Sequence, residues 1–198
     1  FAPLLLCISF FCSPTLALAS PQEAVFAGGC FWCLEHDLEG LTGVFSVESG
    51  YTGGNIVEPT YRNHKGHQEA VIVYFDPLKT SYEKLLRSYW RNVDPLDGAG
   101  QFCDRGDSYR PVIFIRDESQ RSFAIQSSEK AAKELDKTIK SLKVEINDAK
   151  KFWLAEEYHQ NFAKRNSLKY NFYRYSCGRD ARLEEIWEDR ASTADEWH

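Results

Sequence analysis

The sequence predicts an α/β fold of the α+β type: a ferredoxin-like two-layer sandwich with a C-terminal extension wrapped around the core. Three observations predict it. Strand and helix patterns follow one another in the order β-α-β-β-α-β. The 198 residues suffice for one sizeable core, and no internal repeat or low-complexity linker divides them. We therefore expect a single domain over residues 20–198, with its core at about 24–165 and the extension at 166–198.

The first half of the chain is predicted to hold three strands and two helices. The third strand shows clear alternation, with Glu69, Val71, Val73 and Phe75 on one face, and Asp76-Pro77 ends it. Thr80 or Ser81 can cap the second helix. The expected strands are Ala24–Ala27, Val44–Tyr51 and His67–Phe75, and the expected helices are Phe31–Glu39 and the segment from 81 to 92.

The second half begins with a glycine-containing loop from Asp94 to Tyr109 that carries Cys103. Asp117 then opens a helix, with Gln120 three residues later as a capping-box partner. Two long glycine-containing loops are the expected place for a site, because binding residues favour loops held on a rigid scaffold. The remaining expected elements are strands at Pro111–Arg116 and Val144–Ile146 and helices at 117–138, Ala155–Lys164 and Asp180–Trp187.

Composition is that of a globular protein, with 43% apolar and 27% charged residues. The net charge of −5 disfavours nucleic acid as a partner. Residues 1–19 differ from the rest: an apolar run, Leu4–Phe11, precedes Ala17-Leu18-Ala19, which fits a signal-peptidase site. The run is too short to span a membrane. We expect a cleavable signal peptide at 1–19 and an exported protein, with a bacterial periplasm as the best fit; a retained membrane anchor is the alternative.

The chemistry of the chain is expected to centre on Cys30. It follows Gly28-Gly29 and precedes the helix from Phe31, so it lies at or near a helix N-terminus. Unpaired backbone amides and the helix dipole stabilise an anion there, which lowers the pKa of a cysteine and favours the nucleophilic thiolate. The alternative is a cysteine buried in an aromatic core, the usual place of a Phe-Trp-Cys run.

Four cysteines remain after the leader: Cys30, Cys33, Cys103 and Cys177. In an exported protein they could form two structural disulfides with three possible connectivities. A domain of this size does not need such staples, however, and the four are not spread as a disulfide framework would be. Cys30 and Cys33 form a C-x-x-C motif that follows a strand and opens a helix, as in thioredoxin-like oxidoreductases.

Five motifs in order make the chain resemble peptide methionine sulfoxide reductase A. The resemblance spans roughly Phe26 to Asn161, nearly the whole expected core, and the set is specific although any one motif is weak. The motifs are Gly29-Cys30-Phe31-Trp32, Gly50-Tyr51-Thr52-Gly53-Gly54, Gly66-His67-Gln68-Glu69-Ala70-Val71, Asp104-Arg105-Gly106-Asp107-Ser108-Tyr109-Arg110 and Glu156-Glu157-Tyr158-His159-Gln160.

The resemblance implies thiol-dependent reduction of methionine-S-sulfoxide, free or in proteins, without a metal or organic cofactor. It implies that Cys30 is the nucleophile and that Glu69 protonates the sulfoxide oxygen. Tyr51 and Tyr109 are implied as hydrogen-bond donors to that oxygen. The resemblance further implies a supporting polar role for Asp104 and, for Phe31 and Trp32, a pocket for the substrate methyl group.

The residue types suit this chemistry. Sulfoxide oxygen is a poor leaving group, so an acid must protonate it, and a carboxylic acid does so near neutral pH only if burial raises its pKa. Glu69 lies in an apolar strand, where a carboxylate is unusual; its alternative is an exposed residue of an edge strand. Two phenols can stabilise the developing charge on oxygen, although tyrosines packed with their hydroxyls outward are common.

Attack by Cys30 leaves a sulfenic acid on this residue. A second thiol must condense with the sulfenic acid to form a disulfide, and an outside reductant must then reduce that disulfide. Many relatives end in a glycine-rich tail with two cysteines, whereas this tail has one cysteine and few glycines. Cys177 is our first choice of resolving cysteine, with Cys33 and Cys103 as rivals. Cys33 is close to Cys30 in sequence, but because the two are at helical spacing, the start of the helix would have to bend for their sulfurs to meet. We expect a thioredoxin-type reductant and a monomeric protein with no stable membrane insertion.

Two other readings stay open. The first is a thioredoxin-like disulfide oxidoreductase using Cys30 and Cys33, and the second is a non-enzymatic exported module held by structural disulfides. The aromatic and arginine residues of the tail are expected to pack as a belt around the core, with docking of an acidic reductase as the alternative. His64 and His67 beside Glu69 do not complete a standard metal-ligand spacing, so no metal site is expected.

Overall fold

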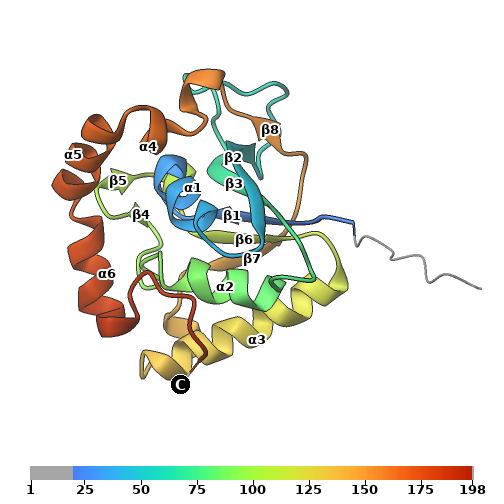
Figure 1. The fold of residues 1–198 in the computed structure, drawn as a ribbon, viewed down its shortest axis with the longest axis vertical. Coiled ribbons are helices and arrows are strands. Elements are labelled where there is room, and N and C mark those ends of the chain that lie inside the picture. The colour runs from blue at the N-terminus through green and yellow to red at the C-terminus, as the bar shows by residue number, and fades with distance from the viewer. Residues whose placement is uncertain (1–19, 198) are drawn as a thin grey trace, which may run out of the picture.

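A computed structural model describes residues 20–197. A six-stranded sheet in the order β7-β6-β1-β3-β2-β8 forms its centre (Figure 1). The strands β1, β3, β2 and β6 pair antiparallel, and only β6 and β7 pair parallel. The strands are β1 Gln22–Ala27, β2 Val44–Thr52, β3 Gln68–Phe75, β6 Val112–Ile115, β7 Glu145–Asp148 and β8 Trp153–Leu154, and a separate small hairpin consists of β4 Gly100–Gln101 and β5 Asp104–Arg105.

One face of the sheet packs against helices. Alternate side chains of β1 point to opposite faces of the sheet. Ala24 and Phe26 join the main core beneath the helices, whereas Val25 and Ala27 belong to a smaller apolar cluster on the other face. Ala149 and Phe152 pack against that smaller cluster. The first three helices are α1 Phe31–Glu39, α2 Tyr82–Trp90 and α3 Glu118–Glu134. A mixed α/β fold with a central sheet, as predicted from the sequence, is therefore present.

The expected caps form. Ser81 caps α2 by accepting a hydrogen bond from the amide of Lys84, and Asp117 caps α3 by accepting one from Gln120. α1 has the predicted bounds. The third helix ends at Glu134, before the expected Thr138, because Leu135 takes the C-cap position and Asp136 has a positive φ of 51°.

The segment that follows the core differs from the prediction. The expected helix at Ala155–Lys164 is wrong: a short 3-10 turn at Glu157–His159 is separated from α4, Phe162–Arg165, by Asn161, whose left-handed φ of 53° interrupts the helix. A helix that we did not predict, α5 Ser167–Cys177, comes next and ends at Gly178 with φ 70°. It is followed by α6, Arg179–Trp187, close to the predicted bounds.

Helices α4, α5 and α6 lie along one side of the molecule, next to α1 and the β4–β5 hairpin (Figure 1). Residues from the C-terminal extension thereby reach the end of the sheet where β1 runs into α1. The expected signal peptide at 1–19 lies outside the described residues. Within the described part of the chain, no helix has both the length and the apolar character needed to cross a bilayer.

Candidate active site

Cys30 lies between β1 and α1, outside the helix. It is the N-cap residue, with φ −57° and ψ 122°, and its carbonyl accepts the amide of Cys33 at 3.1 Å. The preceding glycines are required for packing: a Cβ on Gly28 would lie 2.6 Å from a methyl of Val93, and Gly29 has a φ of +84° and faces Gln101. The two glycines thus let the loop press closely against its neighbours and fix the position of Cys30.

A small cavity of about 60 Å³ opens beside Cys30. Aromatic and acidic side chains from five separate segments converge on it, which is the arrangement expected of a reaction site. A larger hollow of about 570 Å³ between β1, α2 and α3 is lined by no cysteine, so it lacks a nucleophile of this kind. The residues lining the small cavity are Cys30, Phe31, Trp32, Tyr61, Glu69, Asp104, Tyr109 and Tyr173.

Glu69 is the buried acid of this cavity. It lies on β3, where only 1% of its surface is exposed, and its Oε2 accepts the backbone amide of Phe31 at 3.2 Å. Burial raises the pKa of the Glu69 carboxyl to about 8, and the charge of Asp104 adds to this effect. The side chain is therefore protonated at neutral pH. The prediction of a buried acid with a raised pKa agrees with this geometry, and the alternative of an exposed edge-strand residue does not.

Asp104 and Tyr109 enter from the loop after α2. Asp104 accepts the backbone amide of Cys30 and the hydroxyl of Tyr173, the latter at 2.5 Å. Burial raises the pKa of the Asp104 carboxyl. Tyr109 ends a 3-10 turn, its hydroxyl bonds to Glu69, and burial raises its pKa, so it is a phenol donor. The structure therefore places Asp104 and Tyr109 beside Cys30 and Glu69, the residues with which the resemblance groups them.

Tyr51 does not line the cavity. It is fully buried on β2, and its hydroxyl donates to Oε2 of Glu156 at 3.0 Å. The other oxygen of Glu156 accepts the backbone amide of Tyr61 at 3.0 Å. Tyr51 thus positions the carboxylate of Glu156, which in turn positions the backbone of Tyr61. The phenol at the cavity is that of Tyr61, which bonds to Tyr109.

Phe31 and Trp32 form an aromatic wall. Trp32 stacks on Phe162, with ring centroids 3.7 Å apart and planes 7° apart, and its indole N–H donates to Nδ1 of His159 at 3.1 Å. The ring of Phe31 lies 4.9 Å from His159 and 5.8 Å from Tyr51. These contacts hold both aromatic side chains rigidly at the cavity, where they can exclude water and contact a small apolar group.

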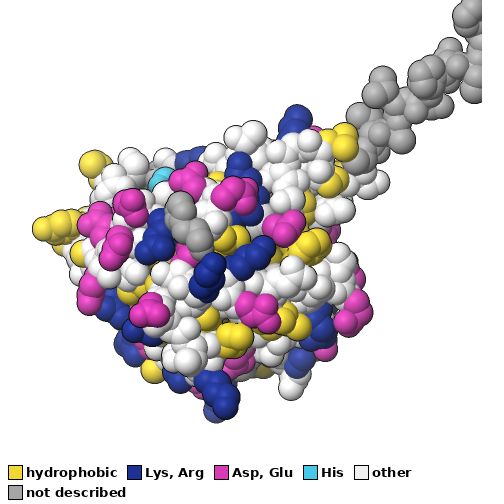
Figure 2. Space-filling view, turned by 90° about the horizontal axis from the view of Figure 1, so that it is seen from below, with side chains coloured by type: hydrophobic (Ala, Val, Ile, Leu, Met, Phe, Trp, Pro, Cys, Tyr) yellow, Lys and Arg dark blue, Asp and Glu magenta, His cyan; other side chains and the backbone are white. Residues whose placement is uncertain are grey.

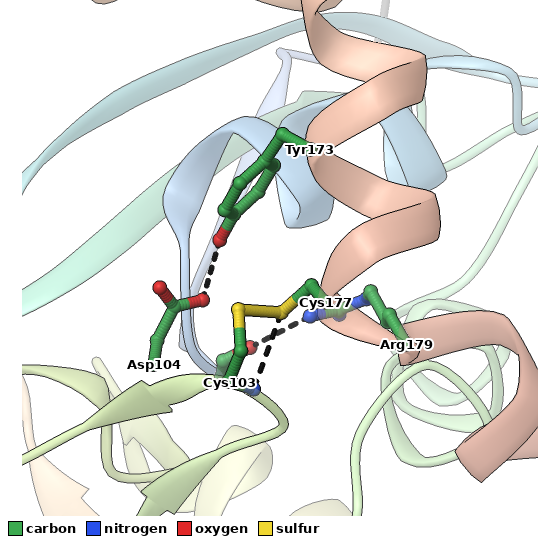
Figure 3. Close-up of a disulfide and its surroundings, with 6 residues drawn as sticks. Cys103, Asp104, Tyr173, Cys177 and Arg179 are labelled. Carbon is green, nitrogen blue, oxygen red and sulfur yellow. Dashed lines mark hydrogen bonds between the residues drawn. A yellow bond between two sulfur atoms is a disulfide. The ribbon is translucent and has the colours of Figure 1, made fainter.

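The cysteines fall into two states. Cys30 and Cys33 are free and buried, and their side chains hydrogen-bond to one another. Burial raises the pKa of the Cys30 thiol well above its ordinary value, although the sequence led us to expect a lowered one. The pKa of Cys33 is lowered, chiefly by the hydrogen bond from Cys30. Cys103 and Cys177 form a disulfide (Figure 3).

Sequence reasoning missed two lining residues, Tyr61 and Tyr173. Tyr61 lies in the long loop between β2 and β3, where no periodicity marks it, although Pro59-Thr60-Tyr61 is a candidate turn. Tyr173 lies on α5, which we did not predict. The aromatic density of the tail was the available signal. His67 bonds the carbonyl of Ile56 and the amide of Gly54 through its two ring nitrogens, and this is a structural role.

Comparisons with known proteins show which family the chain is similar to. A family model described as "Peptide methionine sulfoxide reductase" matches residues 22–191. The chain is 55% identical over 179 residues to "Peptide methionine sulfoxide reductase MsrA 2" of Caulobacter vibrioides, covering 88% of this chain and 90% of the relative.

Two solved structures of Mxr1 from Saccharomyces cerevisiae have a similar fold. The reduced form covers 75% of this chain and 87% of its own, with a TM-score of 0.69 at 22% identity. The complex of Mxr1 with Trx2 covers 79% of this chain and 93% of its own, with a TM-score of 0.52 at 17% identity. At these identities the two structures bear on the fold alone.

Proposed function

The chain belongs to the peptide methionine sulfoxide reductase family, and we propose that it acts on the S epimer of methionine sulfoxide with Cys30 as the nucleophile. It reduces methionine sulfoxide to methionine. The observation that carries the site assignment is the convergence of Cys30, Glu69 and Tyr109 on one small cavity. A thiol nucleophile, a protonated acid and a phenol are the groups that sulfoxide reduction requires.

The first step joins Cys30 to the sulfoxide. The sulfur of Cys30 attacks the substrate sulfur while Glu69, protonated because of its burial, donates its proton to the sulfoxide oxygen. The proton of the Cys30 thiol returns to the carboxylate of Glu69. The raised pKa of Cys30 suits this exchange, because the thiol keeps its proton until the acid has begun to lose its own. The hydroxyl then moves from the substrate sulfur to the sulfur of Cys30 as the bond between the two sulfurs breaks, so the products are a sulfenic acid on Cys30 and methionine.

The other residues that line the cavity stabilise the developing charge and position the reacting groups. Tyr109 and Tyr61 donate hydrogen bonds to the oxygen as the negative charge grows on it, so Tyr61 replaces Tyr51 as the second phenol of the proposal. Tyr51 acts indirectly, through Glu156 and the Tyr61 backbone. Asp104 holds the backbone amide of Cys30, and Phe31 and Trp32 form the pocket for the substrate methyl group.

A disulfide and an outside thiol complete the cycle. The sulfenic acid condenses with a second cysteine of the chain, water leaves, and a reductant of the thioredoxin type returns the protein to its thiol form. Mxr1, a protein of similar fold, has been solved in complex with Trx2, and we propose by analogy a partner of this class for this chain. Among the described residues, the Cys103–Cys177 pair is the disulfide that solvent reaches, since Cys103 is exposed and Cys177 half-buried.

The test uses dithiothreitol and each epimer of a methionine sulfoxide substrate. Methionine from the S epimer alone supports the proposal. Reduction of insulin without reduction of either sulfoxide would support a thioredoxin-like oxidoreductase, for which the hydrogen-bonded Cys30 and Cys33 are the favouring observation. Absence of any thiol-dependent activity would support a module held by structural disulfides.

We propose three broader features of the protein. The order β6-β1-β3-β2, with α1 and α2 as the connecting helices, supports a ferredoxin-like core. We also propose that the protein is a monomer consisting of one catalytic domain. Light scattering, which gives the molar mass in solution, tests this. The apolar run and small-residue site of residues 1–19 support export to a periplasm, tested by N-terminal sequencing of the protein from a periplasmic extract.

A further inference from the structure

The four cysteines of the described chain form two dithiol pairs that differ in burial and oxidation state. Cys30 and Cys33 expose 6% and 2% of their surfaces and are reduced. Cys103 and Cys177 are the more exposed pair and are oxidised. The chemistry takes place at the buried pair, whereas an outside reductant reaches the exposed pair. Electrons must therefore pass between them, and the expectation that Cys177 resolves Cys30 directly leaves Cys33 without a role.

Cys33 reaches Cys30 without any bend in α1. Cys30 is the N-cap, with the non-helical ψ of 122°, and Cys33 is the third residue of the helix. N-cap and third-residue side chains approach one another at a helix start, as they do in a capping box. The hydrogen bond between the two side chains shows that they do so here. The steric objection to Cys33 drawn from helical spacing therefore does not hold.

The surroundings of Cys33 favour its thiolate. Arg179, whose side chain exposes 1% of its surface, and Arg174 both act on it electrostatically. The same two guanidiniums flank Asp37: Arg174 donates to Oδ1 at 2.7 Å, and Nε of Arg179 lies 3.6 Å from Oδ2. A thiolate attacks a sulfenic sulfur, so a cysteine beside one buried and one half-buried cation is suited to the resolving step, even though the charge of Asp37 opposes them.

The exposed pair adjoins the buried one through two residues. Asp104 follows Cys103 and accepts the backbone amide of Cys30. Tyr173 lies one turn before Cys177 on α5, hydrogen-bonds to Cys30, and donates to Asp104 at 2.5 Å (Figure 3). The amide of Cys103 also donates to Sγ of Cys177 at 3.2 Å, a bond that stabilises a thiolate on Cys177 once the pair is reduced.

We propose that Cys33 is the resolving cysteine and that Cys103 and Cys177 form an outer pair that reduces the Cys30–Cys33 disulfide. This deepens the proposed function and rests on it. The thiol of Cys33 displaces the hydroxyl from the Cys30 sulfenic acid, and one disulfide and one water form. Cys177, reduced beforehand by an outside dithiol, attacks that disulfide to give a mixed disulfide. Cys103 then displaces the inner sulfur, so that Cys30 and Cys33 regain their protons and Cys103–Cys177 is oxidised, as in the structure.

The test follows the order in which disulfides form. The fully reduced chain, freed of reductant, receives one equivalent of S-sulfoxide, and samples are quenched in acid over time, alkylated and mapped by mass. The expected first product is Cys30–Cys33, which then gives way to Cys103–Cys177. A mixed disulfide of Cys30 with Cys177 or with Cys103 that precedes any Cys30–Cys33 would overturn the proposal. Failure to release methionine would instead refute the proposed function.

Two variants test the same order of steps without depending on how fast the transient disulfides are quenched. Cys33→Ser should release one methionine per chain and then hold Cys30 as a sulfenic acid that dimedone labels. Formation of Cys103–Cys177 in this variant at the wild-type rate would overturn the proposal, and Cys33→Ala repeats the measurement should the serine variant fold poorly. The double variant Cys103→Ser/Cys177→Ser should instead end as a stable Cys30–Cys33 disulfide without dimedone label. A labelled Cys30 there would equally exclude Cys33 as the resolving cysteine.

Discussion

Replacing Glu69 with glutamine should stabilise the protein while it disables the enzyme. Glutamine has the shape of the protonated acid and keeps an oxygen for the Phe31 amide that Glu69 now binds at 3.2 Å. It has no proton to donate to a sulfoxide oxygen. General acid catalysis contributes about 10²- to 10⁴-fold, so turnover should fall by roughly that factor. The aromatic pocket and Cys30 stay in place, so the loss lies in the chemical step.

The gain in stability follows from the pKa of Glu69. In the unfolded chain the carboxyl has its ordinary pKa of 4.5, whereas in the folded protein burial raises it to about 8. At pH 7 the chain must therefore take up a proton as it folds, at a cost of about 3 kcal/mol. The raised pKa means that this cost is absent below pH 4.5, grows between pH 4.5 and 8, and is constant above. Glutamine avoids it at every pH.

The assay compares urea unfolding of the wild type and Glu69→Gln from pH 5 to pH 8. The difference in unfolding free energy between the variant and the wild type should increase with pH across this window. A difference of about 3 kcal/mol at pH 7 should raise the melting temperature of the variant by roughly 6–12 °C, because each kcal/mol shifts it by about 2–4 °C in a domain of this size. The wild-type kcat/KM should decline as pH rises through about 8, because Glu69 ionises.

Glu35→Gln is the matched control. Glu35 is equally buried on α1, burial raises its pKa to about 7, and it accepts the amide of Asn161 at 3.0 Å, away from the cavity. This control should show a pH-dependent gain in stability yet keep turnover and its decline at alkaline pH. A stability difference between the wild type and Glu69→Gln that does not vary with pH would refute the reasoning, since it would mean that Glu69 is ionised in the folded protein.

Four further substitutions test the assignment of the site. Cys30→Ser should abolish methionine formation with dithiothreitol, and normal activity in this variant would remove Cys30 as the nucleophile. Tyr61→Phe should lower kcat by about 10²- to 10³-fold through loss of one donor to the oxygen, whereas Tyr51→Phe, which leaves the cavity lining intact, should lower it less; equal losses would assign both phenols the same role. Cys177→Ser should release one methionine per chain but stop recycling by a thioredoxin, and unchanged multiple turnover with thioredoxin would show that the outer pair is dispensable.

The parts of the site that the sequence predicted lie on regular elements or directly beside them. Glu69 is conspicuous because alternation in β3 leaves a carboxylate in an apolar strand, yet the pattern alone favours an exposed edge-strand residue. Cys30 is conspicuous because strand, glycines and helix follow one another within a few residues, yet the pattern alone fits a buried structural cysteine equally well. In both cases the local pattern gives the position of the residue, and the resemblance to a family supplies its expected role.

The parts that the sequence did not predict depend on packing between distant segments. Tyr51 follows a glycine and Tyr61 follows Pro59-Thr60, so the local sequence does not distinguish them; in the fold the hydroxyl of Tyr51 binds Glu156, whereas Tyr61 contacts Glu156 only through its backbone and lines the cavity with its side chain. The helix α5 was missed because its aromatic and arginine residues lack a clear apolar stripe. Tyr170 is the one residue of this helix that is fully buried, so contacts with the core stabilise the helix more than its own periodicity does.

The pKa of Cys30 shows why position in the sequence is a poor guide to reactivity. A helix N-terminus favours a thiolate by roughly 0.3–1 kcal/mol at exposed sites, whereas burial of an ion costs several kcal/mol. Cys30 exposes 6% of its surface and faces Glu69, so burial has the larger effect and raises its pKa. A protonated thiol and a protonated carboxyl can share a dry cavity, where two anions could not. Cys30 and Glu69 therefore both rest in their neutral forms, and the oxygen of a bound sulfoxide is the acceptor that draws the proton from Glu69 and, in turn, from Cys30.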